Sequence, residues 1–210
     1  VVAPGQPADA YILNTCTVTH LADRKSRHLL RLARRRHPGA LVVATGCYAQ
    51  RAPQELAAIE GLLVVGNAEK ERLLHLVRER LDSSTPAPAA EHHPGRTRAL
   101  VKVQEGCPGR CAFCIVPRVR GPGRSRPQAR IIEEVRARVA EGYREVVLTG
   151  TQLGYYGRGS SEGGSLKDLV ERLLAEAGVE RLHLSSLQPQ DLGPGFIGLW
   201  QDRRLCRHLH

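Results

Sequence analysis

The sequence lacks several features that would each indicate a different class of protein. No apolar run approaches the ~18 residues of a membrane-spanning helix, and no signal peptide opens the chain, so we expect no membrane partner. Aromatic residues make up only 4% of the chain, too few for base-stacking platforms to dominate a nucleic-acid site. Methionine is absent, so Val1 is not an initiator and we expect the natural start to be missing.

Positive charge is what the chain has in excess. Its 31 Lys and Arg against 21 Asp and Glu give a formal net charge of +10, with a pI near 9.8. Such a balance favours a polyanionic partner, either nucleic acid or an acidic membrane surface. The alternative is an arginine-rich surface that is merely solvated. Hydrophobic content of 41% over 210 residues indicates a globular protein of one or two domains.

The first part of the chain alternates strand and helix patterns. Short apolar runs read as buried strands, and basic stretches with periodic apolar residues read as amphipathic helices. We expect strands over 9–13, 40–45 and 62–65, and helices over 19–37, 53–59 and 69–81. This alternation predicts a parallel sheet with helices packed on it, in an amino-terminal domain over residues 1–81.

A Pro- and Ser-rich stretch over residues 82–98 has no periodic pattern and reads as a linker. The alternation then resumes in a second domain over 99–210. We expect strands over 99–103, 145–148 and 181–185, helices over 129–142, 166–177 and around 196–200, and loops over 104–127 and 149–164. This is the beginning of a barrel or open sheet. We expect the chain to end before a closing element, which would leave strand 181–185 with an unpaired edge.

Three of the six cysteines lie in one loop, as Cys107-Pro-Gly-Arg-Cys111-Ala-Phe-Cys114. A longer chain without a secretion signal favours thiols as metal ligands or catalysts over disulfides. Zinc sites usually pair ligands as C-x2-C and need four. Three thiolates instead satisfy three corners of a cubane iron–sulfur cluster, whose open iron can bind S-adenosylmethionine and cleave it to a radical. A zinc knuckle with a distant fourth ligand is the alternative.

Two further cysteines follow predicted strands. Cys16 and Cys47 each fall just past the carboxyl end of a parallel strand, where the sites of open α/β sheets gather. Two buried structural cysteines are the alternative, because free cysteine is a common core residue. Cys206 reads as a core or surface thiol.

These segments resemble one family. Val103–Cys107 through Cys114–Pro117, then Arg120-Gly121 and Ser125-Arg126-Pro127, look like the radical core of the methylthiotransferases. Asn14–Thr19 and Thr45–Gln50 resemble that family's amino-terminal domain. The resemblance implies a parallel methylthiotransferase α/β domain followed by the first half of a radical S-adenosylmethionine partial (βα) barrel. It also implies a transferase that converts a C–H bond to C–S–CH3.

The resemblance implies the cofactors as well: S-adenosylmethionine and two 4Fe-4S clusters. Cys107, Cys111 and Cys114 would hold one cluster, and Cys16 and Cys47 an auxiliary one. One S-adenosylmethionine would methylate a sulfur on the auxiliary cluster and a second would yield the radical, so no side-chain acid or base is needed. The family's third auxiliary ligand lies upstream, and residues 1–15 contain no cysteine. We therefore expect the isolated 210-residue chain to be inactive.

Short motifs indicate the branch of the family. Cys16-Thr-Val-Thr19 and Cys47-Tyr-Ala-Gln50 resemble the branch acting on N6-threonylcarbamoyladenosine beside the tRNA anticodon. Other branches act on isopentenyladenosine in tRNA or on a ribosomal-protein aspartate. The implied partners are the tRNA anticodon stem-loop and an electron donor, in the cytoplasm. A non-catalytic, zinc-stabilised RNA-binding module is the alternative from another class.

The remaining candidates are ligand-binding residues. Thr149–Gly154 resembles the family segment beside S-adenosylmethionine; an ordinary βα loop is the alternative. Cofactor-binding candidates are Gly150, Gln152, Ser185, Ser186 and Arg126. Since guanidinium groups bind phosphate bidentately, RNA-binding candidates are Arg118, Arg120 and Arg124 near the cysteine loop and Arg34, Arg35 and Arg36 on the basic helix. A solvated charged face is the alternative for that helix.

Overall fold

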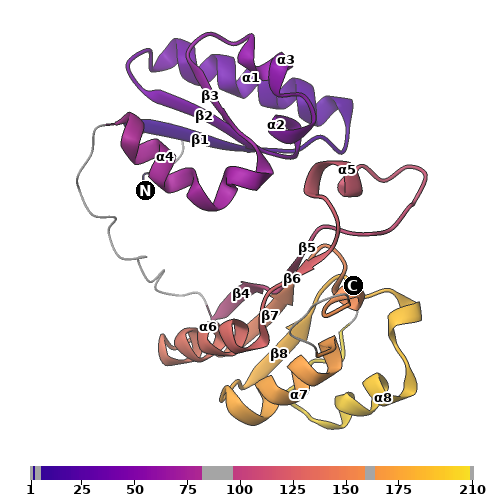
Figure 1. The fold of residues 1–210 in the computed structure, drawn as a ribbon. Coiled ribbons are helices and arrows are strands. Elements are labelled where there is room, and N and C mark those ends of the chain that lie inside the picture. The colour runs from indigo at the N-terminus through magenta and orange to yellow at the C-terminus, as the bar shows by residue number, and fades with distance from the viewer. Residues whose placement is uncertain (1, 3–5, 82–96, 159–163, 209–210) are drawn as a thin grey trace. The chain divides into compact units, whose positions relative to one another are not determined.

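The computed structural model describes residues 2, 6–81, 97–158 and 164–208. The chain divides into two compact units, Val1–Pro88 with Arg118–Arg120, and Ala89–Pro117 with Gly121–His210 (Figure 1). Within the described ranges, no helix is both long and apolar enough to cross a membrane.

The first unit contains a three-stranded parallel sheet in the order β1-β2-β3. Its strands are β1 (Ala10–Thr15), β2 (Leu41–Gly46) and β3 (Leu62–Val65). Its helices are α1 (His20–Arg36), α2 (Cys47–Arg51), α3 (Pro53–Ala57), the 3-10 turn η1 (Asn67–Arg72) and α4 (Leu73–Arg80). The strands and α1 lie within two residues of their predicted positions, whereas α2 was not predicted.

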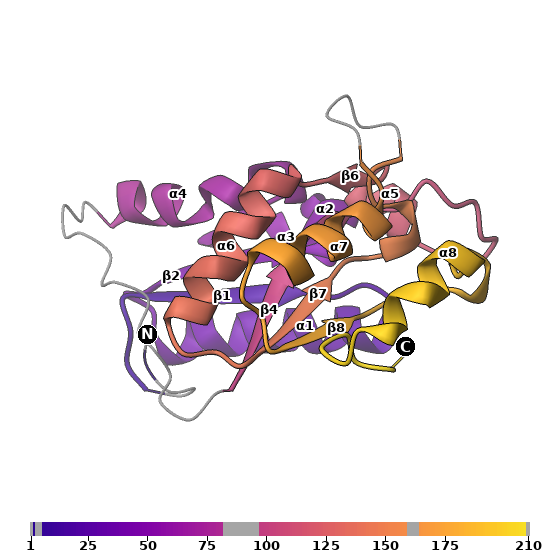
Figure 2. The ribbon, with the colours of Figure 1, turned by 90° about the horizontal axis from the view of Figure 1, so that it is seen from below.

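Helices cover both faces of this sheet. On one face Leu30 of α1, Tyr48 of α2 and Leu56 of α3 pack with Val42 and Ala44 of β2. On the other face, Val77 of α4 packs against Val43 and Val65. Figures 1 and 2 show α4 on the side of the sheet opposite α1. Because residues of β2 point alternately to the two faces, its continuous apolar run is explained by burial on both sides.

The second unit has a parallel sheet in the order β4-β7-β8 and a small antiparallel pair. The sheet strands are β4 (Arg98–Lys102), β7 (Glu145–Thr149) and β8 (Arg181–Leu184), and the pair is β5 (Gln104–Glu105) with β6 (Arg124–Ser125). The long helices are α6 (Gln128–Ala140) and α7 (Leu166–Glu176), and the short elements are α5 (Val116–Arg120), η2 (Leu153–Tyr155), η3 (Pro189–Asp191), α8 (Pro194–Ile197) and η4 (Gly198–Gln201).

Two helices cover one face of this second sheet. Ile131 and Val135 of α6 and Leu169 and Leu173 of α7 are buried in one core with Val146 of β7. The helices lie beside each other over the strands in Figure 2. Parallel strands joined by helices on one side are the arrangement of a partial (βα) barrel.

Three expectations need correction. The predicted loop over 104–127 contains β5, α5 and β6, because a two-residue strand is too short to show a periodic pattern. The outer edge of β8 is not wholly unpaired: Leu182 N–H donates to the Arg204 carbonyl at 2.8 Å, and Cys206 N–H donates to the Leu182 carbonyl at 2.8 Å. Of the predicted linker 82–98, residues 82–96 lie outside the described residues, and Arg98 begins β4.

Candidate metal and cofactor sites

Cys16 and Cys47 leave two neighbouring strands at the same edge. The last residues paired between β1 and β2 are Thr15 and Gly46, and each cysteine follows one of them directly. Neighbouring strands lie about 4.8 Å apart, so the two cysteine backbones are neighbours at the carboxyl end of the sheet. Both cysteines are free thiols, Cys16 exposed and Cys47 half-buried. The sheet therefore brings together the two predicted auxiliary ligands.

A glycine makes this close arrangement possible. Gly46 has φ +96°, and a Cβ placed on it would lie 2.5 Å from both Asn14 Oδ1 and the Thr15 carbonyl oxygen. Any other residue would be strained by this φ and would clash with β1. The chain can thus turn from β2 directly into α2, which begins at Cys47.

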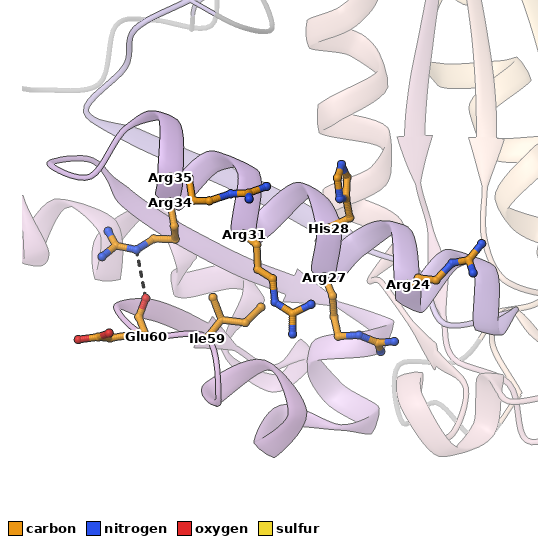
Figure 3. Close-up of a pocket in the computed structure, with 8 residues that line it drawn as sticks. All are labelled: Arg24, Arg27, His28, Arg31, Arg34, Arg35, Ile59 and Glu60. Atoms are coloured by element: carbon orange, nitrogen blue, oxygen red, sulfur yellow. Dashed lines mark hydrogen bonds between the residues drawn. The ribbon is translucent and has the colours of Figure 1, made fainter.

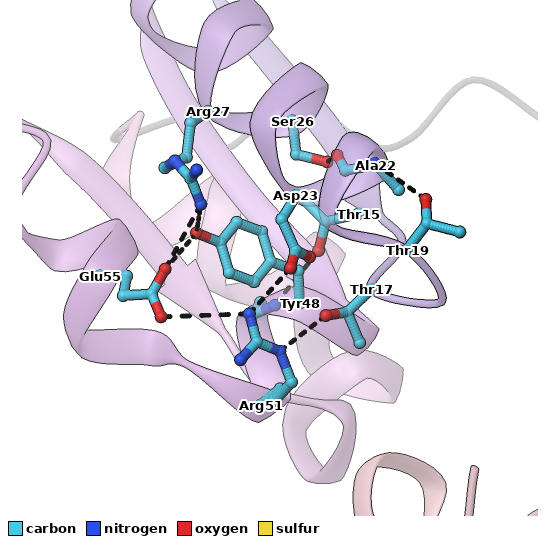
Figure 4. Close-up of polar contacts among 11 residues, drawn as sticks. Thr15, Thr17, Thr19, Ala22, Asp23, Ser26, Arg27, Tyr48, Arg51 and Glu55 are labelled. Carbon is cyan, nitrogen blue, oxygen red and sulfur yellow. Dashed lines mark hydrogen bonds and ion pairs between the residues drawn. The ribbon is translucent and has the colours of Figure 1, made fainter. Parts of the chain in front are cut away.

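Polar contacts tie the segment around Cys16 to α2 (Figure 4). Thr15 Oγ1 donates to the Thr45 carbonyl at 2.6 Å and accepts from Ala49 N–H at 3.2 Å. Arg51 donates from Nε to Thr17 Oγ1 at 2.7 Å and from a terminal nitrogen to Asp23 Oδ2 at 2.9 Å. These bonds fix the backbone on both sides of Cys16 against the helix that starts at Cys47.

Tyr48 anchors the same network from the core. Its ring is fully buried, its hydroxyl donates to Glu55 at 2.7 Å, and the hydroxyl accepts from Arg27. The guanidinium carbons of Arg27 and Arg51 lie 5.6 and 5.2 Å from the ring centre, within cation–π range. Burial, followed by the hydrogen bond to Glu55, raises the pKa of Tyr48, so the phenol stays protonated and holds α2 in place.

The other three cysteines share the loop between β5 and α5. All three are free thiols, with Cys107 and Cys114 half-buried and Cys111 exposed. Cys107 N–H donates to the Gly121 carbonyl at 3.1 Å, and Cys107 Sγ accepts from Gly109 N–H at 3.4 Å. An N–H donor to a ligating sulfur is one of the contacts that tune iron–sulfur clusters.

The loop needs a glycine at its start. Gly106 has φ +77°, and a Cβ there would lie 2.2 Å from the Pro122 carbonyl oxygen. The side-chain volume of any other residue would therefore separate the beginning of the cysteine loop from the segment that returns towards β6.

The three thiols are present and accessible, but the structure does not gather them into a ligand set. Across the described ranges, no group of three or more His, Cys, Asp or Glu side chains is placed to hold a metal ion. The loop fits an iron–sulfur cluster by its donor chemistry, because it supplies three unpaired thiols and a backbone N–H to sulfur. That Cys107, Cys111 and Cys114 together ligate one cluster remains a prediction.

Gln104 connects this loop to the loop after β7, a role that the sequence analysis missed. Its side chain is 2% exposed, and its Nε2 donates to the Gly106 carbonyl at 2.7 Å. Its Oε1 accepts from the N–H groups of Thr151 and Gln152 at 2.9 and 3.0 Å. One buried carboxamide thus joins the two segments expected to meet the cofactors. A buried glutamine carries no sequence signal distinguishing it from an exposed one.

The predicted cofactor residues lie around the same edge. Gly150 packs against Gln104, and a Cβ on it would lie 3.0 Å from Gln104 Oε1. The Gln152 side chain is buried and donates to Asp191 at 2.9 Å, so in this structure it holds two loops together. Ser185 and Ser186 directly follow β8, and the Ser186 carbonyl accepts from Leu153 N–H at 3.1 Å.

The predicted arginines differ in burial and in the contacts that they make. Arg126 forms an ion pair with Glu134 at 2.7 Å and donates to the Lys102 carbonyl at 2.7 Å, so its guanidinium is already committed within the fold. Arg34 likewise donates to backbone carbonyl oxygens. The other predicted RNA-binding side chains are exposed: Arg35, Arg36, Arg118, Arg120 and Arg124.

Two protein families match this chain. The family described as uncharacterized protein family UPF0004 matches residues 1–66, and the Radical SAM superfamily matches residues 101–186. The Bacillus subtilis and Aquifex aeolicus threonylcarbamoyladenosine tRNA methylthiotransferases MtaB are 36% and 38% identical, over 98% and 100% of this chain. The chain belongs to the radical S-adenosylmethionine methylthiotransferase family.

The match covers only part of those methylthiotransferases. This chain spans 49% of the Bacillus subtilis relative and 55% of the Aquifex aeolicus one, about half their length. The family also includes a ribosomal protein uS12 methylthiotransferase RimO from Desulforudis audaxviator, 36% identical over 96% of this chain. The radical S-adenosylmethionine methyltransferase TsrM from Kitasatospora setae shares the fold, with a TM-score of 0.62 at 18% identity over 95% of this chain.

The match to the Radical SAM superfamily indicates two cofactor types. The radical S-adenosylmethionine domain covers both the cysteine loop and the loop after β7. S-adenosylmethionine and a 4Fe-4S cluster are therefore the cofactors of this class of domain. Gln104, which joins the two loops, lies inside the matched region.

Proposed function

We propose that the protein carrying this chain is a tRNA methylthiotransferase that adds a 2-methylthio group to N6-threonylcarbamoyladenosine beside the anticodon, in the cytoplasm. The observation that carries the proposal is the similarity of nearly the whole chain to relatives named for that substrate. The motifs Cys16-Thr-Val-Thr19 and Cys47-Tyr-Ala-Gln50 support the same branch.

In this proposal Cys107, Cys111 and Cys114 would hold one 4Fe-4S cluster, and the chemistry of that cluster when bound would be the reductive cleavage of S-adenosylmethionine. The protein's part is to supply thiolates, place the ligand and limit access of water. Gln104 would set the distance between the cysteine loop and the loop carrying Gly150, because its carboxamide bonds to both. The Cys107 sulfur would keep its bond from Gly109 N–H.

Cys16 and Cys47 would hold the second, auxiliary cluster. A third ligand would be needed, and residues 1–15 contain no cysteine that could supply it. The shared position of the two cysteines at the end of β1 and β2 supports this assignment, since ligands of one cluster must start from neighbouring backbones. We assign residues 1–81 to an auxiliary-cluster domain, 82–97 to a linker and 98–210 to the radical domain, because Arg98 begins β4.

The test uses a fusion in which this chain replaces the matching half of the Bacillus subtilis relative, called here the completed chimera. It is expressed in a Bacillus subtilis strain without that relative, and tRNA nucleosides are analysed by mass spectrometry. We expect the 2-methylthio derivative of threonylcarbamoyladenosine with the chimera and none with its Cys111→Ala variant. Unmodified threonylcarbamoyladenosine from a soluble, iron-loaded chimera would contradict the proposal.

A second candidate follows from the similarity to RimO. In the same cells, ribosomal protein uS12 is measured as an intact protein. Methylthiolated uS12 with unmodified tRNA would assign the chain to that branch and overturn the tRNA proposal.

A further inference from the structure

We propose that a groove along α1 is an RNA-binding surface that holds the phosphate backbone. The inference rests on the proposed function for the identity of the RNA, but the groove itself is described from the structure alone. It has a volume of about 590 Å³. Its lining contains five arginines and comes from α1 and the turn that follows α3: Arg24, Arg27, His28, Arg31, Arg34, Arg35, Ile59 and Glu60 (Figure 3).

The cationic residues follow the period of the helix. Arg24, Arg27, Arg31 and Arg35 are three or four positions apart, so they lie along one side of α1. From Arg24 to Arg35 the helix rises about 16 Å. A row of guanidinium groups of that length matches an extended polyanion better than it matches one small anion.

Two of the arginines are already used by the fold. Arg34 donates from Nε to the Glu60 carbonyl at 3.1 Å and from a terminal nitrogen to the carbonyls of Pro38 and Ala40 at 3.3 and 3.4 Å. Arg27 is bonded to Tyr48 and Glu55. Arg34 and Arg27 therefore shape the groove and fix its walls.

The three other arginines of the groove make no such contacts within the described residues. Arg24, Arg31 and Arg35 are exposed and form no hydrogen bond or ion pair with any residue in the described part of the chain. Like charges three or four positions apart on a helix are unfavourable in the free protein, and Glu60 is the one acidic residue of the lining. The groove therefore carries cationic donors available to an outside anion.

The lining favours RNA phosphate over other polyanionic surfaces. A helix that binds a membrane surface buries an apolar face beneath its cations. The one apolar residue lining this groove is Ile59, which is only 7% exposed. Among the described residues that line it there is no Phe, Tyr or Trp, and its one ring is the His28 imidazole. Base stacking would therefore be limited, and recognition would be mainly of the backbone rather than the sequence.

The groove is also connected to the cysteine edge. α1 begins at His20, capped by Thr19, only a few residues after Cys16. Arg24 lies on the first turns of α1 and Arg35 on its last turn. RNA held along the groove would thus pass from the far end of the unit towards the edge where Cys16 and Cys47 lie.

The test measures RNA affinity of the 210-residue chain by fluorescence anisotropy, with a labelled anticodon stem-loop hairpin. The groove variant is Arg24→Glu with Arg31→Glu. The matched control is Arg72→Glu with Arg80→Glu, which makes the same change in charge at exposed arginines of the same unit. We expect about tenfold weaker binding for each groove arginine and a log–log salt slope smaller by about one for each, against little change in the control.

Equal losses in both variants, or unchanged affinity in the groove variant, would overturn the proposal. Binding to anionic phospholipid vesicles that depends on Arg24 and Arg31, with RNA binding unchanged, would assign the groove to a membrane and overturn it too. Far-ultraviolet circular dichroism checks that each variant folds. If the groove variant misfolds, Arg24→Gln with Arg31→Gln replaces it, and we expect a smaller loss of RNA affinity from that pair. The groove variant could lose RNA affinity as expected while the completed chimera fails to methylthiolate tRNA. That result would contradict the proposed function but would still support the groove as an RNA-binding surface.

Discussion

Gln104 Nε2 donates a hydrogen bond to the carbonyl oxygen of Gly106 at 2.7 Å, one residue before the first cysteine of the cysteine loop. The same carboxamide accepts from the N–H groups of Thr151 and Gln152. The side chain is 2% exposed, so water cannot replace these bonds when it is removed. The two loops are therefore held in register by one residue that contributes no ligand of its own.

Replacing Gln104 by Leu should be costly, because it removes the three hydrogen bonds that this buried carboxamide makes with Gly106, Thr151 and Gln152. We expect the free energy of unfolding to fall by about 2–4 kcal/mol. We also expect faster hydrogen exchange over 106–115 and 150–153, measured by mass spectrometry. The control is the exposed Gln201→Leu. Equal exchange in the two variants would show that Gln104 does not couple the loops.

The shared edge of Cys16 and Cys47 predicts that one short reagent can bridge them. Dibromobimane, which links two nearby thiols, should join these cysteines in the metal-free chain, because each directly follows a residue of the last pair in the β1–β2 register. Peptide mass spectrometry identifies the linked pair, and Cys16→Ser is the control. A product linking either cysteine mainly to Cys206 would contradict the register.

Arg51 and Asp23 should be energetically coupled. The Asp23 side chain is 6% exposed, and its other oxygen, Oδ1, has no hydrogen-bond partner among the described residues. Arg51→Met would remove the one counter-charge that is hydrogen-bonded to this carboxylate among the described residues. Since the Arg51 side chain is 33% exposed, we expect a loss of only about 2 kcal/mol.

A double-mutant cycle separates the pair from simple packing. Adding Asp23→Asn to Arg51→Met should restore more than half of the lost unfolding free energy, because the unpaired charge is removed. Additive losses in urea denaturation would mean that the two side chains stabilise the unit independently.

His183 should make stability sensitive to acid. Burial, the largest cause, lowers the pKa of His183, against the opposing effect of Glu145 and with smaller contributions from Arg98, Arg181 and His208. The unfolded state, with a histidine pKa of about 6.5, therefore binds more protons than the folded state below that pH. Stability should be retained above about pH 6.5 and fall as the pH drops below it.

The check compares the unfolding free energy between pH 7 and pH 5 in His183→Gln and in His75→Gln, whose side chain is 64% exposed. Only His183→Gln should reduce the loss on acidification, by at most about 1.4 kcal/mol per pH unit. Identical pH dependence in the two variants would mean that His183 titrates as a solvated histidine.

The alternation of apolar runs with amphipathic stretches was enough to predict both parallel sheets, because buried strands appear in the sequence as short apolar runs. Leu62–Val65 was predicted with its observed bounds. The pair of Gln104–Glu105 with Arg124–Ser125 was missed, since two-residue strands are fixed by tertiary hydrogen bonds rather than by local sequence. Helix α2 was missed because it starts at Cys47, immediately after Gly46.

The candidate site was predictable in its residue types but not in its connections. Cys16 and Cys47 were expected at strand ends, and the register of Thr15 with Gly46 places them at one edge. The contacts of Gln104 with Thr151 and Gln152, and of Arg51 with Thr17, join residues 34 to 48 positions apart in the sequence. Such contacts depend on the packed fold, and one sequence offers no signal for them.

If the cysteine loop belongs to a radical S-adenosylmethionine enzyme, the completed chimera should form 5′-deoxyadenosine. The product is measured after the chimera has been reconstituted anaerobically with iron and sulfide and then reduced. Cys206→Ala serves as the matched control for Cys111→Ala, because Cys206 is a free thiol of the same unit outside the loop. We expect 5′-deoxyadenosine from the parent and Cys206→Ala proteins and none from Cys111→Ala; formation at the parent rate by Cys111→Ala would show that the loop does not hold the cluster.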